Sequence, residues 1–320
     1  MKVLVTGAAG CLGRAVCARL LARGHEVRGV DLAGPSGGSF AGAWARGDLF
    51  ELDLAGLCAG CDAVVHLAAL VHRPDLSDPA EYLRVNVEGT RRMLEAARAA
   101  GIAPARFVFS STVGVYPRDH GLHADETTPC APRTPYGVSK LEAERRVLEH
   151  GGVVLRFPLL YGSGDRGRMA ALIGAIARGR FVLPGPCREP RSLVASANAA
   201  EGVALSLERA VGGGVYLVTD DDDVPVRRLV EGIVAALPGR AMPPELPLAL
   251  LWPAALLGSA LAAARLHTPL TVDALLKLTT RLTFSCALAR RDLGYRPVIT
   301  LESGIREEVG EVVRGGARRT

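Results

Sequence analysis

The chain has 320 residues, of which 49% are hydrophobic and 22% charged, so it can bury a large core and lacks the composition of a disordered protein. The formal net charge of +5 reads as spread along the chain, without a basic patch interleaved with aromatics, which argues against a nucleic-acid partner. Seven cysteines, an odd number, in a chain that opens on a strand-like segment predict reduced thiols and a cytoplasmic protein. Cys58 and Cys61 form a CxxC pair, but no second pair at metal-ligand spacing accompanies it, so no metal site is expected.

The first half of the chain alternates short apolar segments with segments rich in alanine, arginine and leucine. This alternation predicts strands at 2–6, 26–31, 63–67, 106–110 and 153–157, and helices at 12–23, 80–100 and 136–149. Strands separated by helices form a parallel sheet that is covered on both faces. The expected fold class is therefore α/β, with a doubly wound parallel sheet of the Rossmann type.

Beyond about residue 160 the alternation weakens, and proline and glycine become frequent. We interpret this change as a second, smaller lobe of mixed α/β structure. Residues 1–160 would then form the Rossmann domain, and residues 161–320 would be mainly the substrate-binding lobe. Residues 215–219 still have the pattern of a strand, which predicts that the second lobe is interleaved with the last elements of the sheet.

Residues 246–264 are 19 residues without a charge, which is close to the length that a bilayer span needs. Pro247 and Pro253 interrupt this stretch, and several of its residues are alanine. The pattern favours a buried or surface-docked helix over a true span, and it leaves peripheral contact with a membrane as a prediction.

A glycine-rich turn, GAAGCLG, directly follows the first predicted strand and directly precedes the first helix. Small residues in this context let the backbone turn tightly and approach a pyrophosphate, whose charge then lies at the N-terminal end of the helix. The turn therefore predicts a dinucleotide site. Its expected cofactor-binding residues are Gly7, Gly10, Cys11, Leu12 and Gly13.

Asp31 ends the second predicted strand, where a carboxylate can accept hydrogen bonds from the ribose hydroxyls of the adenosine and repel a 2′-phosphate. This position favours NAD over NADP, although Arg14 and Arg28 are near enough in the sequence to leave NADP open. Asp48 and Leu49 follow the next segment and are expected near the adenine. A solvated loop carboxylate is the alternative for Asp48.

Small residues follow the fourth strand, where Leu67, Ala68 and Ala69 would allow close passage of the cofactor. His66, within that apolar strand, is interpreted as a core histidine and not as a catalyst. Asn86 lies inside a predicted helix, where asparagine is unfavourable by propensity, and this indicates a buried hydrogen-bonding role in the cofactor site.

Tyr136 and Lys140 stand four residues apart in YGVSK, so a helix places both side chains on one face. An ammonium near a phenol favours the phenolate and lowers a tyrosine pKa from about 10 toward the range in which the group can act as an acid or base. Thr112 ends the preceding strand and could hold a substrate oxygen against Tyr136. Ser110 is expected at the cofactor and Ser111 at the substrate, and simple capping of the strand end is the alternative for both.

Together, GAAGCLG, Asp31, HLAA, NVEGT, FSST, YGVSK, LRFPLLYGSGD and LGYRPVITLESG resemble the extended short-chain dehydrogenase/reductase family, also called the NAD-dependent epimerase/dehydratase family. The resemblance covers essentially the whole chain. It implies that Thr112, Tyr136 and Lys140 are the catalytic triad, and that Phe157 and Pro158 line the nicotinamide side of the pocket. It also implies a homodimer, and a mechanism in which Tyr136 takes the proton of a secondary alcohol as hydride leaves its carbon for NAD, or the reverse.

The resemblance leaves the reaction open. The family's dehydratases carry an Asp-Glu pair after the catalytic threonine, and here Val113 and Gly114 follow it, which disfavours dehydration. Residues 155–194 are similar to nucleotide-sugar epimerases and ketoreductases, and Arg191 would bind the diphosphate. Residues 269–297 are similar to 3β-hydroxysteroid and sterol dehydrogenases, which would suit a lipid substrate. A non-catalytic NAD-binding protein is the third hypothesis, and the nucleotide sugar is the first.

Overall fold

The computed structural model describes residues 1–35, 40–71, 78–117, 123–165, 167–209, 211–263, 266, 268 and 270–317. Ala264 and Pro269, which belong to two of the segments interpreted above, lie outside these residues. The chain forms two compact units. Unit 1 contains residues 1–160, 193–221 and 284–299, and unit 2 contains residues 161–192, 222–283 and 300–320.

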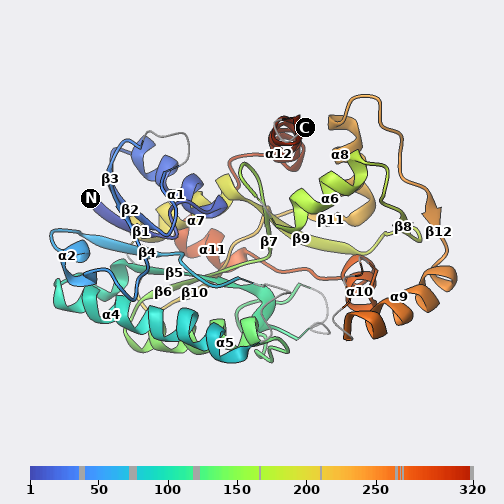
Figure 1. The fold of residues 1–320 in the computed structure, drawn as a ribbon. Coiled ribbons are helices and arrows are strands. Elements are labelled where there is room, and N and C mark those ends of the chain that lie inside the picture. The colour runs from blue at the N-terminus through green and yellow to red at the C-terminus, as the bar shows by residue number, and fades with distance from the viewer. Residues whose placement is uncertain are drawn as a thin grey trace. The chain divides into compact units, whose positions relative to one another are not determined.

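Unit 1 is built on a parallel sheet of seven strands in the order β10-β6-β5-β4-β1-β2-β3 (Figure 1). Its strands are β1 (Lys2–Thr6), β2 (Glu26–Asp31), β3 (Ala43–Arg46), β4 (Ala63–His66), β5 (Phe107–Thr112), β6 (Val153–Phe157) and β10 (Val215–Leu217). Five of the predicted strands are thus confirmed to within two residues, and the strand expected at 215–219 forms the edge of the sheet. The order changes direction at β1, and such a switch point in an open α/β sheet is where ligands bind.

Helices cover both faces of this sheet, as the prediction of a doubly wound fold requires. Figure 1 shows α4 and α5 along one face and α1 and α7 along the other. The helices of unit 1 are α1 (Cys11–Ala22), α2 (Leu54–Cys58), α3 (Pro79–Tyr82), α4 (Gly89–Ala99), α5 (Pro135–Glu149), α7 (Ser196–Arg209) and α11 (Ala287–Leu293). The strands are apolar on both sides, and successive side chains enter two different cores. Val3 and Val5 pack with α1 and α7, while Leu4 packs with α4 and α5.

The helix predicted at 80–100 is interrupted by a π-helical segment, Leu83–Glu88, between α3 and α4. This segment contains Asn86, and π-helical turns inside α-helices are frequent at functional sites. Periodicity could not reveal the extra residue in the turn, because apolar residues line the same face on both sides of it.

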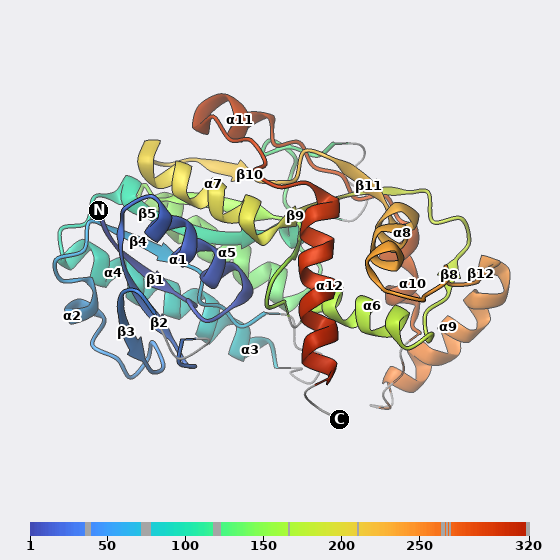
Figure 2. The same ribbon diagram turned by 90° about the horizontal axis from the view of Figure 1, so that it is seen from above.

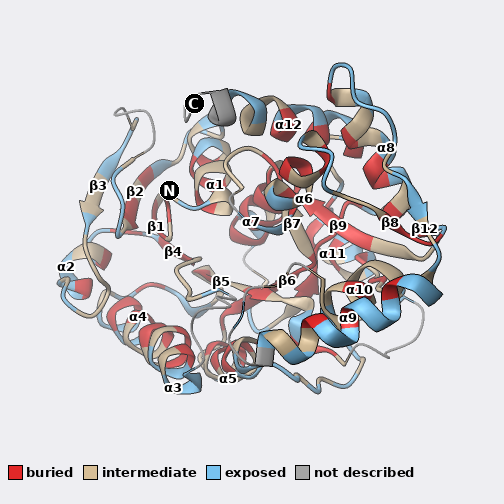
Figure 3. Ribbon diagram, turned by 45° about the vertical axis from the view of Figure 1, so that its right-hand side comes forward, coloured by how far each residue is buried: buried red, intermediate tan, exposed pale blue. Residues whose placement is uncertain are grey.

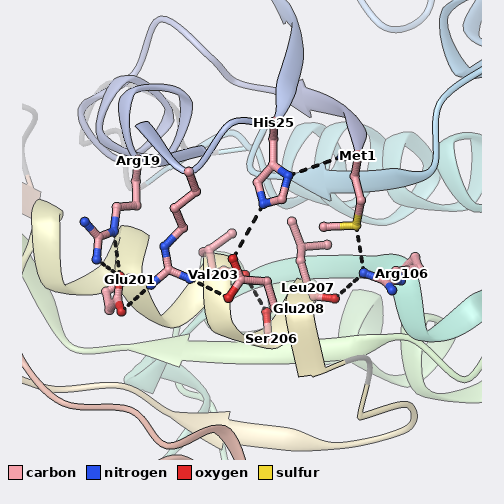
Figure 4. A network of polar contacts seen from close by, with 10 residues as sticks. Met1, Arg19, His25, Arg106, Glu201, Val203, Ser206, Leu207 and Glu208 are labelled. Atoms are coloured by element: carbon pink, nitrogen blue, oxygen red, sulfur yellow. Dashed lines mark hydrogen bonds and ion pairs between the residues drawn. The ribbon is translucent and has the colours of Figure 1, made fainter. Parts of the chain in front are cut away.

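Charged side chains fasten α1 to α7 on the outer face of these two helices, which lie side by side (Figure 2). In Figure 4 the Arg19 guanidinium faces the carboxylate of Glu201, with Nε and Nη2 at 2.6 and 2.5 Å from Oε2. Arg23 bridges Glu201 and Glu208, at 2.6 and 2.5 Å. The helix that begins at the glycine-rich turn is therefore held in place from outside as well as by its apolar face.

Unit 2 contains a three-stranded sheet in the order β11-β9-β7 and a parallel pair, β12-β8. Helices α6, α8 and α12 pack on one another, and α9 packs on α10. The elements are β7 (Leu159–Tyr161), α6 (Arg168–Ala177), β8 (Leu183–Pro184), β9 (Pro190–Ala195), β11 (Asp223–Pro225), α8 (Val226–Ala236), β12 (Glu245–Leu246), α9 (Leu248–Ala263), α10 (Val272–Thr279) and α12 (Leu301–Ala317).

Two carboxylates of α12 hold the loop of the YGSGD motif. Glu308 Oε2 accepts a hydrogen bond from the Gly162 amide at 2.9 Å, and Glu311 Oε2 accepts one from the Gly164 amide at 2.5 Å. Gly162 and Gly164 both have positive φ, 133° and 78°, which glycine adopts without strain. Burial raises the pKa of Glu308 to about 8. The motif thus has a structural role within unit 2, in tying α6 to α12.

The charge of the chain is not evenly spread, contrary to the interpretation from the sequence. Of the 38 lysines and arginines, 22 lie in unit 1 and 16 in unit 2; of the 33 aspartates and glutamates, 22 lie in unit 1 and 11 in unit 2. The whole excess of +5 therefore belongs to unit 2. Counted along the sequence, residues 1–160 carry a net charge of +1 and residues 161–320 carry +4, so most of the excess lies in the second half of the chain even without the division into units.

Candidate functional site

The glycine-rich turn connects β1 to α1, and each of its glycines meets a different steric demand. Gly7 has φ +69°, and a Cβ there would lie 2.7 Å from the Ala68 amide nitrogen. A Cβ at Gly13 would overlap the Gly7 carbonyl oxygen and the backbone of Ala8. At Gly10, by contrast, the nearest atom to a Cβ is the Gly7 carbonyl oxygen at 3.3 Å. The fold itself explains Gly7 and Gly13. A Cβ at Gly10 would make one tight contact, with the Gly7 carbonyl oxygen, and a glycine at the start of α1 also permits the close approach of a phosphate to the backbone.

The N-terminus of α1 has the donors that such an anion needs. Gly10 is the N-cap residue and supplies no capping side chain, so Cys11 and Leu12 begin the helix with main-chain N–H groups at its positive end. This geometry is compatible with the pyrophosphate site that the sequence predicts, which stays a prediction.

Asp31 lies at the end of β2, beside this turn. Its carboxylate accepts hydrogen bonds from the Ala9 amide and the Ala33 amide, each at 3.0 Å. The Gly47 amide donates to the Asp31 carbonyl oxygen at 3.0 Å, which brings the loop of Asp48 and Leu49 to the same edge. Asp48 Oδ1 accepts a hydrogen bond from the Phe50 amide at 2.9 Å, so this carboxylate stabilises its own loop.

His66 is confirmed as a core histidine. Its Nδ1 lies 2.7 Å from Thr6 Oγ1 and its Nε2 lies 3.2 Å from Thr90 Oγ1, both in the buried interior. Burial lowers the pKa of His66 to about 3, with a further lowering by Lys140, so the ring is neutral at physiological pH. Thr6 Oγ1 also accepts a hydrogen bond from the Ala68 amide at 3.2 Å. The histidine therefore helps to hold Leu67 and Ala68 alongside the glycine-rich turn.

Asn86 has the buried hydrogen-bonding role that its position in a helix predicted, and its partners are protein groups. Its Oδ1 accepts from the Leu70 amide at 2.8 Å, and its Nδ2 donates to the Leu70 carbonyl at 3.1 Å and to Ser139 Oγ at 2.9 Å. Ser139 Oγ in turn donates to the Tyr136 carbonyl oxygen at 2.8 Å. Asn86 thus joins the loop after β4, including Ala69, to the first turn of α5.

Helix α5 has a well-defined start, formed by residues 134–137. Thr134 is the N-cap, with its Oγ1 accepting from the Gly137 amide at 3.1 Å, and Pro135 occupies the first turn. A Cβ at Gly137 would lie 2.5 Å from the Gly114 carbonyl oxygen, so only glycine permits this approach. The contact joins the residue after Tyr136 to a residue two positions beyond Thr112. It is the feature that brings the end of β5 to the start of α5.

Tyr136 is half-buried, and its ring packs edge-on against the ring of Tyr82, with centroids 6.4 Å apart and planes at 64°. Tyr82 is itself almost fully buried at the end of α3. Tyr82 is not among the site residues that the sequence predicts. The only signal for it was a large aromatic residue four positions before Asn86.

Lys140 is buried, with its Nζ 3.9 Å from the centroid of the Phe109 ring. Burial lowers the pKa of Lys140 to about 7, and the nearby Glu144 carboxylate raises it in part. The ammonium and the phenol of YGVSK share the inner face of α5, as their spacing predicted. A buried lysine at this pKa is ready to gain a hydrogen-bonding ligand.

A buried ion pair lies one turn further along α5, and sequence reasoning missed it. Arg156 donates to Glu144 through Nε, at 3.1 and 3.2 Å from the two carboxylate oxygens, and through Nη2 at 2.6 Å from Oε2. Arg156 Nη1 also donates to the Tyr116 hydroxyl at 2.6 Å. Ser111 Oγ donates to Glu144 Oε1. An arginine inside the apolar run 153–157 was the signal for this pair.

The two hydroxyls at the end of β5 point to opposite faces of the sheet, because side chains alternate along a strand. Ser111 points to the buried carboxylate below α5, whereas Thr112 points to the other face and its Oγ1 accepts from the Gly114 amide at 3.0 Å. Ser110, on the face of Thr112, is half-buried. Thr112 pairs in register with Phe157, which is buried together with Pro158.

The parallel register places the predicted residues of unit 1 at one edge of the sheet, namely the edge formed by the carboxyl ends of the strands. Thr6, His66 and Phe109 are aligned across β1, β4 and β5, so the chain leaves all these strands on the same side. The glycine-rich turn, Asp31, the 67–69 segment, Thr112, Phe157 and the start of α5 therefore share that edge. Such an edge can bind an extended anionic cofactor and present a phenol and an ammonium beside it.

Arg191 lies in unit 2, on β9, and its guanidinium is largely enclosed. Its Nη2 donates to the Lys277 carbonyl oxygen and, at 3.4 Å, to the Thr280 carbonyl oxygen. Its Nε is buried with no hydrogen-bond partner among the described residues. Burial lowers the pKa of Arg191 to about 10. In the described parts of the chain, no group of three or more His, Cys, Asp or Glu side chains could hold a metal ion.

Comparison with known proteins agrees with this geometry. The model of the NAD dependent epimerase/dehydratase family matches residues 3–219. The chain is 33% identical over 321 residues to the 4-hydroxy-2-methyl-3-oxo-4-farnesyl-3,4-dihydroquinoline-1-oxide ketoreductase of Stigmatella aurantiaca, with 95% of each chain covered. It is 32% identical over 333 residues to the 2-alkyl-3-oxoalkanoate reductase of Stenotrophomonas maltophilia (strain K279a), with 96% of this chain and 98% of the reductase covered. The solved structure of MoeE5 in complex with UDP-glucose and NAD is 27% identical, has a TM-score of 0.78, and is covered over its full length by 99% of this chain.

Proposed function

We propose that this chain, which belongs to the NAD dependent epimerase/dehydratase family, is an NAD-dependent oxidoreductase that interconverts a ketone and a secondary alcohol on a largely apolar molecule. The observation that carries the chemistry is the approach of Gly137 to the Gly114 carbonyl, which joins Thr112 and Tyr136 at the edge of the sheet where the glycine-rich turn lies. Three residues would hold the cofactor along its length: Gly10 at the central pyrophosphate, Asp31 at the adenosine ribose and Lys140 at the nicotinamide ribose.

In this proposal NAD, when bound, accepts or returns a hydride at the carbinol carbon. Tyr136 acts as the acid or base at the substrate oxygen: its phenol oxygen takes the hydroxyl proton of the alcohol, or gives a proton to the ketone oxygen. Thr112 hydrogen-bonds that same oxygen and holds it against Tyr136. The Lys140 ammonium stabilises the phenolate by its charge.

The preference for an apolar substrate rests on the curated relatives. Arg191 does not decide it, because two main-chain carbonyls accept from its Nη2 while its buried Nε has no hydrogen-bond partner among the described residues. Two curated relatives that match 95% and 96% of this chain are, by their names, reductases of ketones that carry a farnesyl or an alkyl chain. The apolar substrate is therefore placed before the nucleotide sugar, which reverses the preference drawn from the sequence.

A nucleotide-sugar epimerase or reductase is the second candidate, supported by the likeness to MoeE5 over the full chain. A thermal-shift screen with NAD present separates the two, because a ligand that binds only the native state raises the melting temperature. We expect 2-alkyl-3-oxoalkanoates or hydroxysteroids to stabilise the protein and uridine diphosphate to leave it unchanged. Stabilisation by uridine diphosphate alone would favour the second candidate.

The acid–base role has its own test. Tyr136→Phe removes the phenol oxygen, so turnover with the substrate found in the screen should fall at least 100-fold while NAD affinity stays within a few-fold. Tyr216→Phe, which removes a phenol on β10, is the matched control and should retain turnover. Full activity of Tyr136→Phe would contradict the proposed mechanism and leave the cofactor site standing.

A further inference from the structure

Helix α9 has a solvent-facing side without a charged, hydroxyl or amide side chain. Four large side chains on it, Leu250, Trp252, Leu256 and Leu257, are 66%, 37%, 60% and 63% exposed, and we call them the α9 outer face. Figure 3 shows the outward side of α9 in the colour of exposed residues. Exposed apolar residues are ordinary when scattered, but a continuous patch on one helix marks an interaction surface.

The opposite side of α9 is already packed against the protein, so the α9 outer face cannot be buried by turning the helix over. Leu251 and Ala255 are buried against Leu275 of α10. Ser259, the only hydroxyl-bearing residue of the helix, accepts a hydrogen bond from the Val272 amide at 2.9 Å and therefore points inward. The helix is apolar on every side, and such helices are found in protein cores or in contact with lipid.

We propose that the α9 outer face docks onto the surface of an anionic phospholipid bilayer. Leucines at these positions would enter the acyl boundary, and Trp252 would lie at the headgroup level, which is where tryptophan is enriched. A 16-residue helix is about 24 Å long at a rise of about 1.5 Å per residue. Within the part of the chain that the structure describes, no helix is long and apolar enough to cross a membrane, so α9 would lie in the interface plane.

Charge selects the bilayer over a second copy of the chain. Unit 2 contains α9 and carries the whole excess of +5, while unit 1 has equal numbers of acidic and basic residues. Two copies meeting through unit 2 would bring like charges together, whereas an anionic surface attracts each basic residue near it by about 1 kcal/mol. A protein partner would also need several hydrogen bonds across the contact, and the indole N–H of Trp252 is the one side-chain donor that the α9 outer face offers.

Exposed arginines of unit 2 supply part of that attraction. Arg178, Arg180 and Arg240 are all exposed, and the Arg240 guanidinium lies close to Gly179, which separates the other two arginines in the sequence. They precede β8 and β12, the parallel pair from which α9 starts. We call them the basic cluster.

The direct test uses Trp252 as a reporter. In a Trp44→Phe background it is the only tryptophan, since the chain has two. Vesicles of phosphatidylcholine with 30 mol% phosphatidylglycerol should shift its emission to shorter wavelength, and brominated acyl chains should quench it. The same vesicles should sediment the protein, at least tenfold more strongly than vesicles of phosphatidylcholine alone. Unchanged emission and no sedimentation would overturn the proposal.

Variants locate the contact. The double variant Leu256→Glu with Leu257→Glu should lose at least tenfold in vesicle affinity, and replacing the basic cluster with glutamine should weaken binding and reduce its dependence on salt. Val313→Glu on α12 is the matched control, because it adds a charge at an exposed valine of the same unit, and it should change affinity less than twofold.

Because the substituted leucines are exposed, the melting temperature should be unchanged, which excludes unfolding as the cause. Full vesicle binding by the double variant would overturn the proposal. So would an emission shift that follows protein concentration without vesicles, because it would assign the α9 outer face to self-association. These readouts involve no turnover, so they are independent of the proposed reaction.

Discussion

Replacing Arg156 by methionine should destabilise unit 1 strongly, because it breaks the buried ion pair beneath α5. Glu144 and Arg156 are 1% and 5% exposed, and the carboxylate accepts three of its four hydrogen bonds from the guanidinium. Methionine fills a similar length with apolar atoms, so little cavity is created. The carboxylate would remain buried with only the Ser111 hydroxyl as donor, and such a loss costs about 3 to 5 kcal/mol.

The magnitude can be read from thermal unfolding with the cofactor absent. For a domain of this size, about 1 kcal/mol changes the melting temperature by about 2 to 4 °C, so a fall of about 6 to 20 °C is expected. Adding Glu144→Gln to Arg156→Met removes the stranded charge and should recover at least half of that loss. Such a recovery in a double-mutant cycle measures the coupling of the two side chains directly.

An exposed ion pair provides the comparison. Arg228 of α8 contacts Glu302 at 2.9 Å, and both side chains are about half exposed. Arg228→Met should cost less than about 1 kcal/mol, because solvent screens exposed pairs. If Arg156→Met were equally mild, or if the double variant were no more stable than the single one, the carboxylate would be solvated in solution and the reasoning from burial would be wrong.

Further predictions concern the cofactor site. Gly10→Ala should leave the melting temperature nearly unchanged but weaken NAD binding at least tenfold. Gly13→Ala should lower the melting temperature as well as the NAD affinity, because of these two residues only Gly13 would have a Cβ that overlaps the turn itself. Equal melting temperatures of the two variants would contradict this. Asp31→Ala should shift the preference toward NADP in a direct titration of both cofactors, and indifference would remove Asp31 from the ribose site. Burial lowers the pKa of Lys140 to about 7 in the free protein, and ribose hydroxyls would favour the ammonium, so NAD binding should take up a proton and weaken as pH rises above 7, by up to tenfold per pH unit. Calorimetry at pH 8 in buffers of different ionisation heat measures that proton. An NAD affinity that does not change between pH 6 and pH 9 would exclude the proposed contact.

Much of unit 1 followed from local pattern. The strands at 2–6, 26–31 and 153–157 and the start of α5 agree with the sequence to within a residue, because each combines an apolar period with strong start and stop residues. The glycine-rich turn was recognisable for the same reason: its three glycines answer steric demands that arise within a few residues. The fold class and the edge of the sheet that carries the site followed from the order of these elements.

Other features depended on contacts between distant segments. Asn86 could be suspected of a buried role, but its partners, Leu70 and Ser139, lie 16 and 53 residues away. Which of Ser111 and Thr112 reaches the buried Glu144 was decided by the register of β5 against its neighbours, which a one-residue slip would reverse. The enclosure of Arg191 by carbonyls of residues 277 and 280 likewise has no signal near residue 191.

By itself, then, the sequence determined the parallel sheet, the dinucleotide turn and the shared face of Tyr136 and Lys140, because helical and strand periods and glycine sterics act over a few residues. Tertiary structure alone decided which charges are buried and which hydroxyl faces which layer. Burial and pairing are properties of segments that meet only after folding, and they set the pKa of Lys140, the Glu144–Arg156 pair and the uncovered face of α9.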